Sequence, residues 1–189
     1  MTDFDFLQAD VETAARRLLG CTLVRELNGQ TLIARIIETE AYHQSDAASH
    51  SYKGRTPRTD IMFGPAGFLY VYFTYGMHYC MNVVTGPAGE GSAVLIRALE
   101  PVQGEEIMRR HRRGLSGPLL TNGPAKACQA LGIDKTLNGH DLRRPPCTLQ
   151  VQPSVSPGSI VQTTRIGISQ AKDVPWRFYI AENPYVSKP

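Results

Sequence analysis

Residues 21–42 read CTLVREL, then Asn28-Gly29, then QTLIARIIETEAY, and they carry the strongest local signal in the chain. Two runs rich in β-branched and apolar residues flank the Asn-Gly pair, which suits the positive φ angles of a type I′ turn. This pattern predicts a β-hairpin with a long second strand.

The segments around this hairpin predict further strands with short helices between them. A bend near Gly76 should divide the aromatic run at 67–85 into a strand pair, and Pro101 should stop a strand at 92–100. Strands are also expected near 147–152, 159–168 and 176–181, helices over 10–19, 104–113 and 122–133, and a helical turn over 59–63 after a long loop at 43–59. Residues 1–189 therefore predict a single α+β domain, with a curved antiparallel β-sheet core flanked by short helices.

The helix at 122–133 has clear boundary residues. Thr121 or Asn122 is the expected N-cap, Pro124 suits the first helical position, and Gly132 should end the helix.

The composition is that of an ordinary globular domain, because 42% of the 189 residues are hydrophobic and 20% are charged. No apolar run approaches the roughly 20 residues that a membrane-spanning helix needs. The first residues lack the basic start and apolar core of an export signal. We therefore expect a cytoplasmic protein without membrane contact. The four cysteines form no C-x-x-C pair, which favours reduced, buried thiols.

The net charge of +3 is unevenly distributed. Residues 1–50 hold four Lys/Arg against eight Asp/Glu, residues 51–125 hold eight against five, and residues 126–189 hold eight against four, so the three parts carry −4, +3 and +4. An acidic start and a basic remainder permit a basic face for a polyanion, although a pI near 8.7 is below that of a dedicated nucleic-acid binder.

Two carboxylates lie in the strand end RIIETEAY (35–42). In a regular pleat one face carries Ile36, Glu38, Glu40 and Tyr42, and the other carries Ile37, Thr39 and Ala41. An unpaired carboxylate in an apolar setting is costly. The acidic face is therefore either a functional site or the end of a strand that runs out into solvent.

The run LYVYFTYGMHYCMN (69–82) is dense in aromatic residues, with Tyr70, Tyr72, Tyr75 and Tyr79 inside ten residues. Such density is usual in a core, but a buried tyrosine hydroxyl needs a partner, and tyrosine rings also build stacking pockets. Beside the acidic strand end, these rings would form a slot for a flat, electron-poor ring.

Several common catalytic motifs are absent from the sequence. It contains no Gly-x-Ser-x-Gly elbow, no GxxxxGK[ST] phosphate loop and no GxGxxG after a strand. Serine hydrolysis of that type, P-loop phosphoryl transfer and dinucleotide redox chemistry are therefore disfavoured. His43 and His50 could join the two glutamates as metal ligands, but their spacing fits no common metal motif. A metal hydrolase built on these residues is one rival interpretation.

Six segments, in this order, carry a resemblance to a known family. They are RIIETEAY (35–42), DAASHSYKGRTPRTDIMFG (46–64), LYVYFTYGMHYCMNVV (69–84), AVLIRALEP (93–101), NGPAKACQALGI (122–133) and PWRFYIAENPYVS (175–187). Together they resemble the alkyladenine DNA glycosylases, also called 3-methyladenine DNA glycosylases. Several ordered matches over nearly the whole chain are far more specific than any one of them.

The resemblance implies a monofunctional DNA glycosylase of base excision repair, acting on the nucleoid of a bacterial-type cytoplasm. Such an enzyme excises alkylated or deaminated purines (3-methyladenine, 7-methylguanine, hypoxanthine and ethenoadenine) from duplex DNA. It flips the nucleotide into a pocket, and a glutamate-activated water attacks C1′ and leaves an abasic site. The resemblance implies no cofactor and no metal. The expected partner is double-stranded DNA containing damaged purines, bound by a monomer.

The resemblance assigns catalytic roles to two residues. Glu40 matches the general base that activates the water. Arg97 matches an arginine that holds the water in line and anchors the phosphate of the lesion. Glu38 is expected to support the site structurally rather than to act as a second catalytic acid.

The resemblance also assigns the contacts of the flipped nucleotide. Tyr42, His50 and Tyr72 match the side chains between which the base stacks. Asn82 matches a residue that disfavours guanine by crowding its 2-amino group.

Contacts to the rest of the DNA follow in the same way. Tyr75 matches the wedge that fills the vacated stack, and Met77 and His78 would line the minor groove. By charge and placement, the candidate phosphate contacts are Arg55, Arg58 and Lys126; the alternative is that these three side chains belong to an ordinary solvated surface.

The rival interpretation from another class is a non-catalytic damaged-DNA or RNA binding module with the same basic and aromatic surface. Such a module would bind without releasing a base, and Glu40 would then be only a surface acid.

Overall fold

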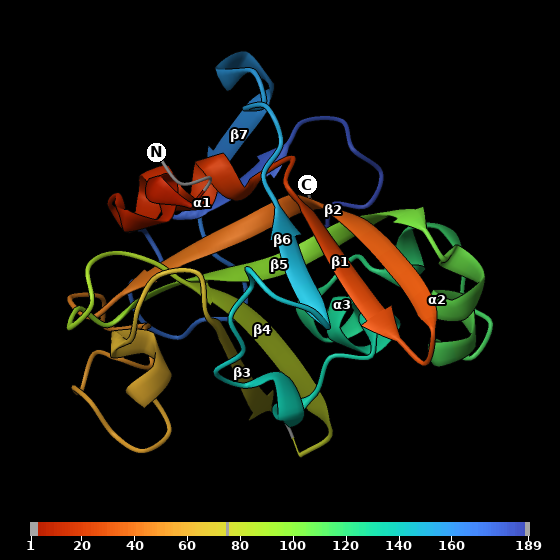
Figure 1. Cartoon of the computed structure of the whole chain (residues 1–189). Coiled ribbons are helices and arrows are strands. Elements are labelled where there is room, and N and C mark those ends of the chain that lie inside the picture. Colours follow the sequence, from red (N-terminus) through yellow and green to blue (C-terminus); the bar gives the residue numbers. More distant parts are fainter. Residues whose placement is uncertain (1–3, 75, 188–189) are drawn as a thin grey trace.

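The predicted hairpin is present and lies within the central sheet (Figure 1). β1 (Thr22–Leu27) pairs antiparallel with β2 (Gln30–His43). Asn28 and Gly29 connect the strands with φ angles of 52° and 73°, as a type I′ turn requires. The structure is a computed structural model that describes residues 4–74 and 76–187.

β2 joins the sheet together, because it pairs with three other strands. On one edge its first half pairs with β1 and its second half with β8, and β5 pairs along the other edge. The sheet order is β3-β4-β5-β2-β1-β6, with β7 paired to β8. The remaining strands are β3 (Leu69–Thr74), β4 (His78–Val84), β5 (Ser92–Gln103), β6 (Cys147–Gln150), β7 (Ile160–Thr163) and β8 (Arg177–Ile180). All of these pairings are antiparallel and the sheet curls, which confirms the predicted fold class (Figure 1).

Short helices flank the sheet, as predicted. They are α1 (Val11–Leu18), α2 (Glu105–His111) and α3 (Pro124–Leu131), with 3-10 turns at η1 (Asp5–Gln8), η2 (Asp60–Phe63), η3 (Gly117–Leu120), η4 (Lys135–Leu137) and η5 (Pro157–Ser159). Ala14 and Leu18 of α1 and Ala127 and Leu131 of α3 are fully buried in one hydrophobic core with the sheet. Burial of these apolar faces, rather than helix propensity, stabilises helices of only two turns.

The predicted stop of a strand at Pro101 is wrong, because β5 continues to Gln103. Pro101 lies opposite Ala34, next to a register irregularity, and beyond the part of β5 that pairs with β4. Sheets tolerate the missing N–H of proline at irregularities and at strand edges.

The predicted N-cap of α3 is also wrong, because Gly123 occupies that position. The Thr121 hydroxyl donates to a backbone oxygen of β5 at 2.5 Å, and Asn122 accepts a hydrogen bond from Nζ of Lys126 at 2.7 Å. Both polar side chains are therefore engaged elsewhere. The helix ends at Gly132, with φ 60°, as predicted.

All four cysteines are buried and free, as the sequence predicted. In the described part of the chain, no helix is both long and apolar enough to cross a membrane.

Candidate active site

Two irregularities in the β2–β5 ladder shape the acidic end of β2. They fall between Ile36 and Glu38 and between Glu38 and Thr39, so the register skips Ile37 on β2 and Arg97 on β5. Ile36 packs in the main core, whereas Ile37 packs in a separate small cluster. The predicted common face of Ile36 and Glu38 is therefore wrong, because the bulge at Ile37 shifts the alternation of side chains.

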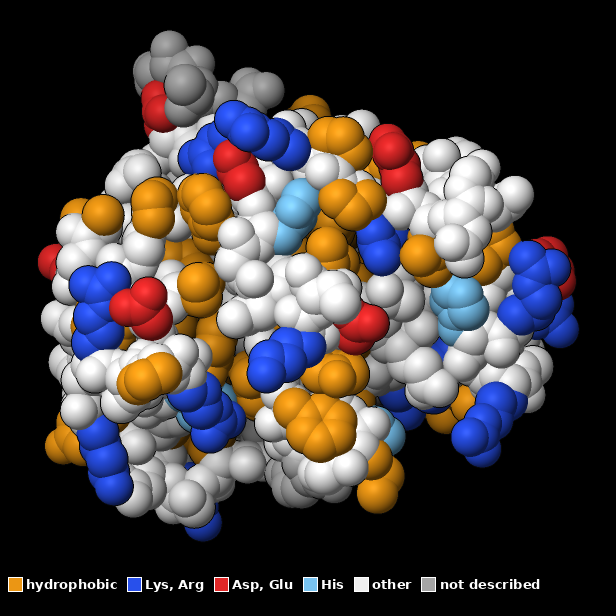
Figure 2. Space-filling model, turned by 60° about the horizontal axis from the view of Figure 1, so that its bottom comes forward, with side chains coloured by type: hydrophobic (Ala, Val, Ile, Leu, Met, Phe, Trp, Pro, Cys, Tyr) orange, Lys and Arg blue, Asp and Glu red, His pale blue; other side chains and the backbone are white. Residues whose placement is uncertain are grey.

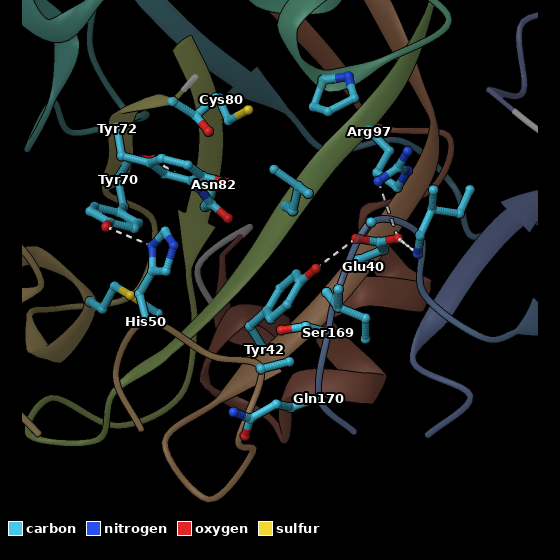
Figure 3. A pocket seen from close by; sticks show the side chains of 18 of the residues that line it. Glu40, Tyr42, His50, Tyr70, Tyr72, Cys80, Asn82, Arg97, Ser169 and Gln170 are labelled. Atoms are coloured by element: carbon cyan, nitrogen blue, oxygen red, sulfur yellow. Dashed lines mark hydrogen bonds and ion pairs between the residues drawn. The ribbon is translucent and has the colours of Figure 1, made fainter. Parts of the chain in front are cut away.

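Glu38, Glu40 and Tyr42 do share a face, and Glu40 is completely buried on it. Its Oε1 accepts the backbone N–H of Ile166 at 2.8 Å and lies 3.3 Å from Nη1 of Arg97, while its Oε2 accepts the Tyr42 hydroxyl at 2.8 Å. The strand therefore does not run out into solvent, and three contacts orient the carboxylate (Figure 3).

Glu38 is buried beside it and holds Arg97 in place. Its Oε1 accepts Nε of Arg97 at 3.1 Å and Nε of Arg177 at 2.8 Å, and its Oε2 accepts the backbone N–H of Ser187 at 2.7 Å. A buried carboxylate with two cations and a donor has its charge compensated. Glu38 is thus a positioning residue that keeps the Arg97 guanidinium beside Glu40.

A cavity of about 460 Å³ opens next to Glu40. Tyr42 lies on one side of it, and His50, Tyr70 and Tyr72 lie on the other (Figure 3). The centres of the His50 and Tyr72 rings are 4.6 Å apart, and the two ring planes meet at 76°. Nδ1 of His50 lies 3.0 Å from the Tyr70 hydroxyl oxygen. Aromatic side chains on both sides of a slot suit a flat ring.

Polar side chains complete the cavity. Asn82 of β4 donates from Nδ2 to the backbone oxygen of Tyr70 at 3.1 Å, and Arg58 of the long loop lines the same space. The predicted catalytic and substrate-binding residues that line this one cavity are Glu40, Arg97, Tyr42, His50, Tyr72 and Asn82.

The buried tyrosines keep their protons at physiological pH. Burial raises the pKa of Tyr42, and the neighbouring Glu40 carboxylate raises it further. Burial likewise raises the pKa of Tyr72. Tyr42 therefore remains a neutral hydrogen-bond donor to Glu40.

Residues 5–184 match the family model described as Methylpurine-DNA glycosylase (MPG). The chain belongs to the methylpurine-DNA glycosylase family. A protein of Carboxydothermus hydrogenoformans, provisionally named 3-methyladenine DNA glycosylase, is 55% identical over 97% of this chain and 96% of its own length. Proteins of the same provisional name from Methanoculleus marisnigri and Nitrosospira multiformis are 52% and 49% identical, over 97% and 98% of this chain and 96% and 92% of their own lengths. The chain is a DNA glycosylase, as its resemblance implied.

One wall of the glycosylase cavity comes from a loop at 164–171 that the sequence predicted in part as a strand. β7 ends at Thr163 instead of continuing to 168. Gly167 has a φ of 77°, which is incompatible with an extended strand. Arg165 is buried, and its guanidinium pairs with the carboxylate of Asp46. This ion pair ties the loop to the long loop that also carries His50.

The sequence did not indicate Arg165 as a site residue, although Arg165 supports two predicted site residues, Tyr42 and Glu40. Its guanidinium lies 4.7 Å from the centre of the Tyr42 ring, and the next residue, Ile166, donates its backbone N–H to Glu40. Its partner Asp46 is 119 residues away in the chain. No local pattern marks a pair so distant, so sequence reasoning had no signal for it.

The predicted phosphate contacts fall into two groups. Arg55 pairs with Asp60 at 2.5 Å on the surface, and Lys126 is half-buried beside Asn122, whereas Arg58 lines the cavity itself. Figure 2 shows Lys and Arg side chains spread across the face at the bottom of Figure 1 rather than collected in one patch. Contacts of these residues to DNA remain predictions.

The predicted wedge, Tyr75, lies outside the described residues. Met77, in the turn before β4, is 69% exposed, and His78, the first residue of β4, is also exposed. Phe73 on β3 is also half-exposed and lies 5.1 Å from the Tyr79 ring, centre to centre. The hairpin therefore presents apolar and aromatic side chains to solvent, as a groove-inserting element would.

The ligands of the rival metal site do not converge. Nε2 of His43 lies 3.9 Å from Glu90, whereas His50 contacts Tyr70 inside the cavity. Within residues 4–74 and 76–187, no group of three or more His, Cys, Asp or Glu side chains is arranged to hold a metal ion.

His50 is expected to be neutral across the physiological pH range. Burial of the imidazole and, second, the like charge of Arg58 lower the pKa of His50 to about 4. An unfolded histidine takes up its proton near pH 6.5. His50 should therefore reduce the stability of the fold as the pH falls from about 6.5 to about 4.

An NMR titration of the imidazole nitrogens would measure this pKa directly. We expect a midpoint near pH 4 for His50 and a higher midpoint in the Arg58→Gln variant. A midpoint near 6.5 in the wild-type protein would contradict the predicted environment.

Proposed function

We propose that this glycosylase excises alkylated or deaminated purines from duplex DNA and leaves an abasic site, as the first step of base excision repair. The observation that carries the proposal is the buried carboxylate of Glu40, oriented by three contacts at the edge of an aromatic cavity. The provisional name of its relatives refers to 3-methyladenine.

The target base would occupy the slot between Tyr42 on one side and His50 and Tyr72 on the other. Because this slot is inside the protein, the nucleotide must leave the duplex stack to reach it. A cationic alkylated purine gains about 0.5–2 kcal/mol from the face of a tyrosine ring. Asn82 in the same cavity would crowd the 2-amino group of guanine.

Glu40 would act at the sugar. Its carboxylate accepts a proton from a water whose oxygen bonds to C1′, while the C1′–N9 bond breaks and its electron pair stays on N9 of the purine. The same negative charge stabilises the oxocarbenium-like sugar in the transition state. Arg97, 3.3 Å from Glu40 and held by Glu38, is placed to orient the water or the phosphate of the lesion.

The proposed product is an intact strand with an abasic site. A lyase needs an amine to form a Schiff base with the sugar, and the described residues that line the cavity include two arginines but no lysine. Borohydride trapping of a covalent protein–DNA adduct would contradict this part of the proposal. Because one chain supplies the whole cavity, we also propose that it acts as a monomer.

Release of a free base is the decisive test. Duplexes carrying one 3-methyladenine, 7-methylguanine, hypoxanthine or ethenoadenine are incubated with excess protein, and the abasic product is cleaved with hot alkali and resolved on a denaturing gel. We expect cleavage at the lesion only. Binding of the damaged duplex without any base release would instead identify a non-catalytic binding module.

A further inference from the structure

Each nitrogen of the Arg97 guanidinium faces a different side chain. Nη1 lies 3.3 Å from Oε1 of Glu40, Nε donates to Oε1 of Glu38 at 3.1 Å, and Nη2 donates to the Ser187 hydroxyl at 3.4 Å. A guanidinium is planar and its donors keep fixed directions. Contacts at Nε and Nη2 together therefore set the direction in which Nη1 points, which is toward Glu40.

Ser187 is itself anchored to Glu38. Its backbone N–H donates to Oε2 of Glu38 at 2.7 Å, and its hydroxyl donates to Oε1 at 2.8 Å. A serine hydroxyl has one donor and two acceptor lone pairs, so it can donate to Glu38 and accept from Arg97 at the same time. Hydrogen bonds to an ionised group are stronger than those between neutral groups. The hydroxyl of Ser187 therefore lies at a defined place between the carboxylate and the guanidinium.

Packing holds the segment that carries Ser187 against the bulge in β2. The preceding residue, Val186, is 9% exposed and packs in one small cluster with Ile37 and Ala98. Ile37 is the residue that the β2–β5 register skips, and Ala98 directly follows Arg97 on β5. The segment after β8 therefore contacts both strands at the point where they place Glu38 and Arg97.

Ser187 lies behind the catalytic cavity rather than in it. The described residues that line the cavity include Glu40 and Arg97 but not Ser187. A target base in the cavity would therefore not contact Ser187. Any effect of this serine on base release must pass through the two side chains that it holds, Glu38 and Arg97.

We propose that Ser187 is a positioning residue for base release, which acts by holding the Arg97 guanidinium with Nη1 toward Glu40. The inference rests on the proposed function, in which Arg97 orients the attacking water or the phosphate of the lesion. Ser187 touches no reacting atom and transfers no proton. Without its hydroxyl, Arg97 keeps the Nε bond to Glu38, but the guanidinium can turn about its Cδ–Nε bond and move Nη1 away from Glu40.

The test measures single-turnover base release by Ser187→Ala, on whichever of the four lesion duplexes the wild-type protein cleaves fastest. The variant removes the hydroxyl and keeps the backbone N–H that Glu38 accepts. A misplacement of about 1 Å can slow a reaction by about 10²-fold, so partial loss of alignment should slow release by about 10-fold. Binding of the same duplex should stay close to wild type. Ser187→Thr, which restores a hydroxyl, should recover most of the rate.

The matched control is Ser92→Ala. Ser92 lies on β5, the strand of Arg97, and its buried hydroxyl pairs with that of Thr85 at 2.8 Å. Loss of a buried hydrogen bond should lower the free energy of unfolding in this variant as well. Its rate of base release should nevertheless equal that of the wild type, because the contacts of Arg97 are unchanged.

A double-mutant cycle shows whether Ser187 acts through Arg97. Arg97→Lys keeps the positive charge but replaces the planar fork by one nitrogen. In that background, Ser187→Ala should cause little further slowing, because there is no fork to orient. A loss that is merely structural would slow release by the same factor in both backgrounds.

Three results would overturn the inference and leave the proposed function intact: unchanged release by Ser187→Ala, no recovery in Ser187→Thr, or equal factors in the two backgrounds of the cycle. In each case the wild-type protein still releases a base. If the wild-type protein releases no base from any of the four duplexes, the proposed function fails, and the role of Ser187 fails with it.

Discussion

Replacing Glu40 by glutamine is expected to slow base release by about 10²–10⁴-fold, the range that a general base contributes. Glutamine has the same shape and keeps an oxygen that can accept the Ile166 N–H now bonded at 2.8 Å. It cannot take up the water proton, and it carries no charge to stabilise the sugar cation. The measurement is single-turnover release from each lesion duplex, with binding of the same duplex measured in parallel.

Binding of the damaged duplex by Glu40→Gln should stay close to wild type, because the aromatic slot is unchanged. Glu100→Gln is the matched control, since Glu100 is a carboxylate on β5 that pairs with Arg35 at 2.5 Å outside the cavity. It should release bases at the wild-type rate. If Glu40→Gln also does so, Glu40 is not the general base.

Replacing Arg165 by methionine is expected to reduce the free energy of unfolding by about 3–5 kcal/mol, because it leaves a buried charge without its partner. The carboxylate left behind is that of Asp46, which is 6% exposed. The backbone oxygen of Ala41, which now accepts Nη1 of Arg165 at 2.9 Å, loses that donor as well. Urea unfolding of the purified variant measures the loss.

The double variant Arg165→Met with Asp46→Asn separates an unpaired charge from a loss of packing. Removing both charges leaves no buried ion, so the double variant should be more stable than the sum of the two single losses implies. Strict additivity would mean that the pair contributes no coupling energy.

Base release by Arg165→Met should also fall, because the loop that carries the Ile166 N–H loses its anchor beside Glu40.

The predictable part of the site follows from local rules. Glu38, Glu40 and Tyr42 share a face because a strand alternates its side chains every residue, and the Asn28-Gly29 turn sets where that strand begins. The same rule failed at Ile36, where the bulge at Ile37 shifts the alternation, and no residue type in RIIETEAY marks a bulge.

The boundaries of elements were less predictable than their existence. Pro101 was expected to end β5. A proline ends a strand only where a neighbouring strand would pair with the backbone N–H that proline lacks. β4 has already diverged from β5 at this position, so no such pairing is lost. Gly123 replaces Thr121 as the cap of α3 because Thr121 finds a partner on β5. In both places the position of a strand elsewhere in the sheet decides the boundary, against a sound local preference.

By itself, the sequence determined the hairpin, the curved antiparallel α+β fold and, through several ordered motifs, the family. These features depend on turn geometry, side-chain alternation and residue identity, all of which act within a few positions. Only the tertiary structure decided that Glu40 is buried and held by Ile166, and that Arg58 lines the cavity. It also decided that Arg165 pairs with Asp46 across 119 residues. Burial and ion pairing are properties of segments brought together by folding, so no window along the chain contains them.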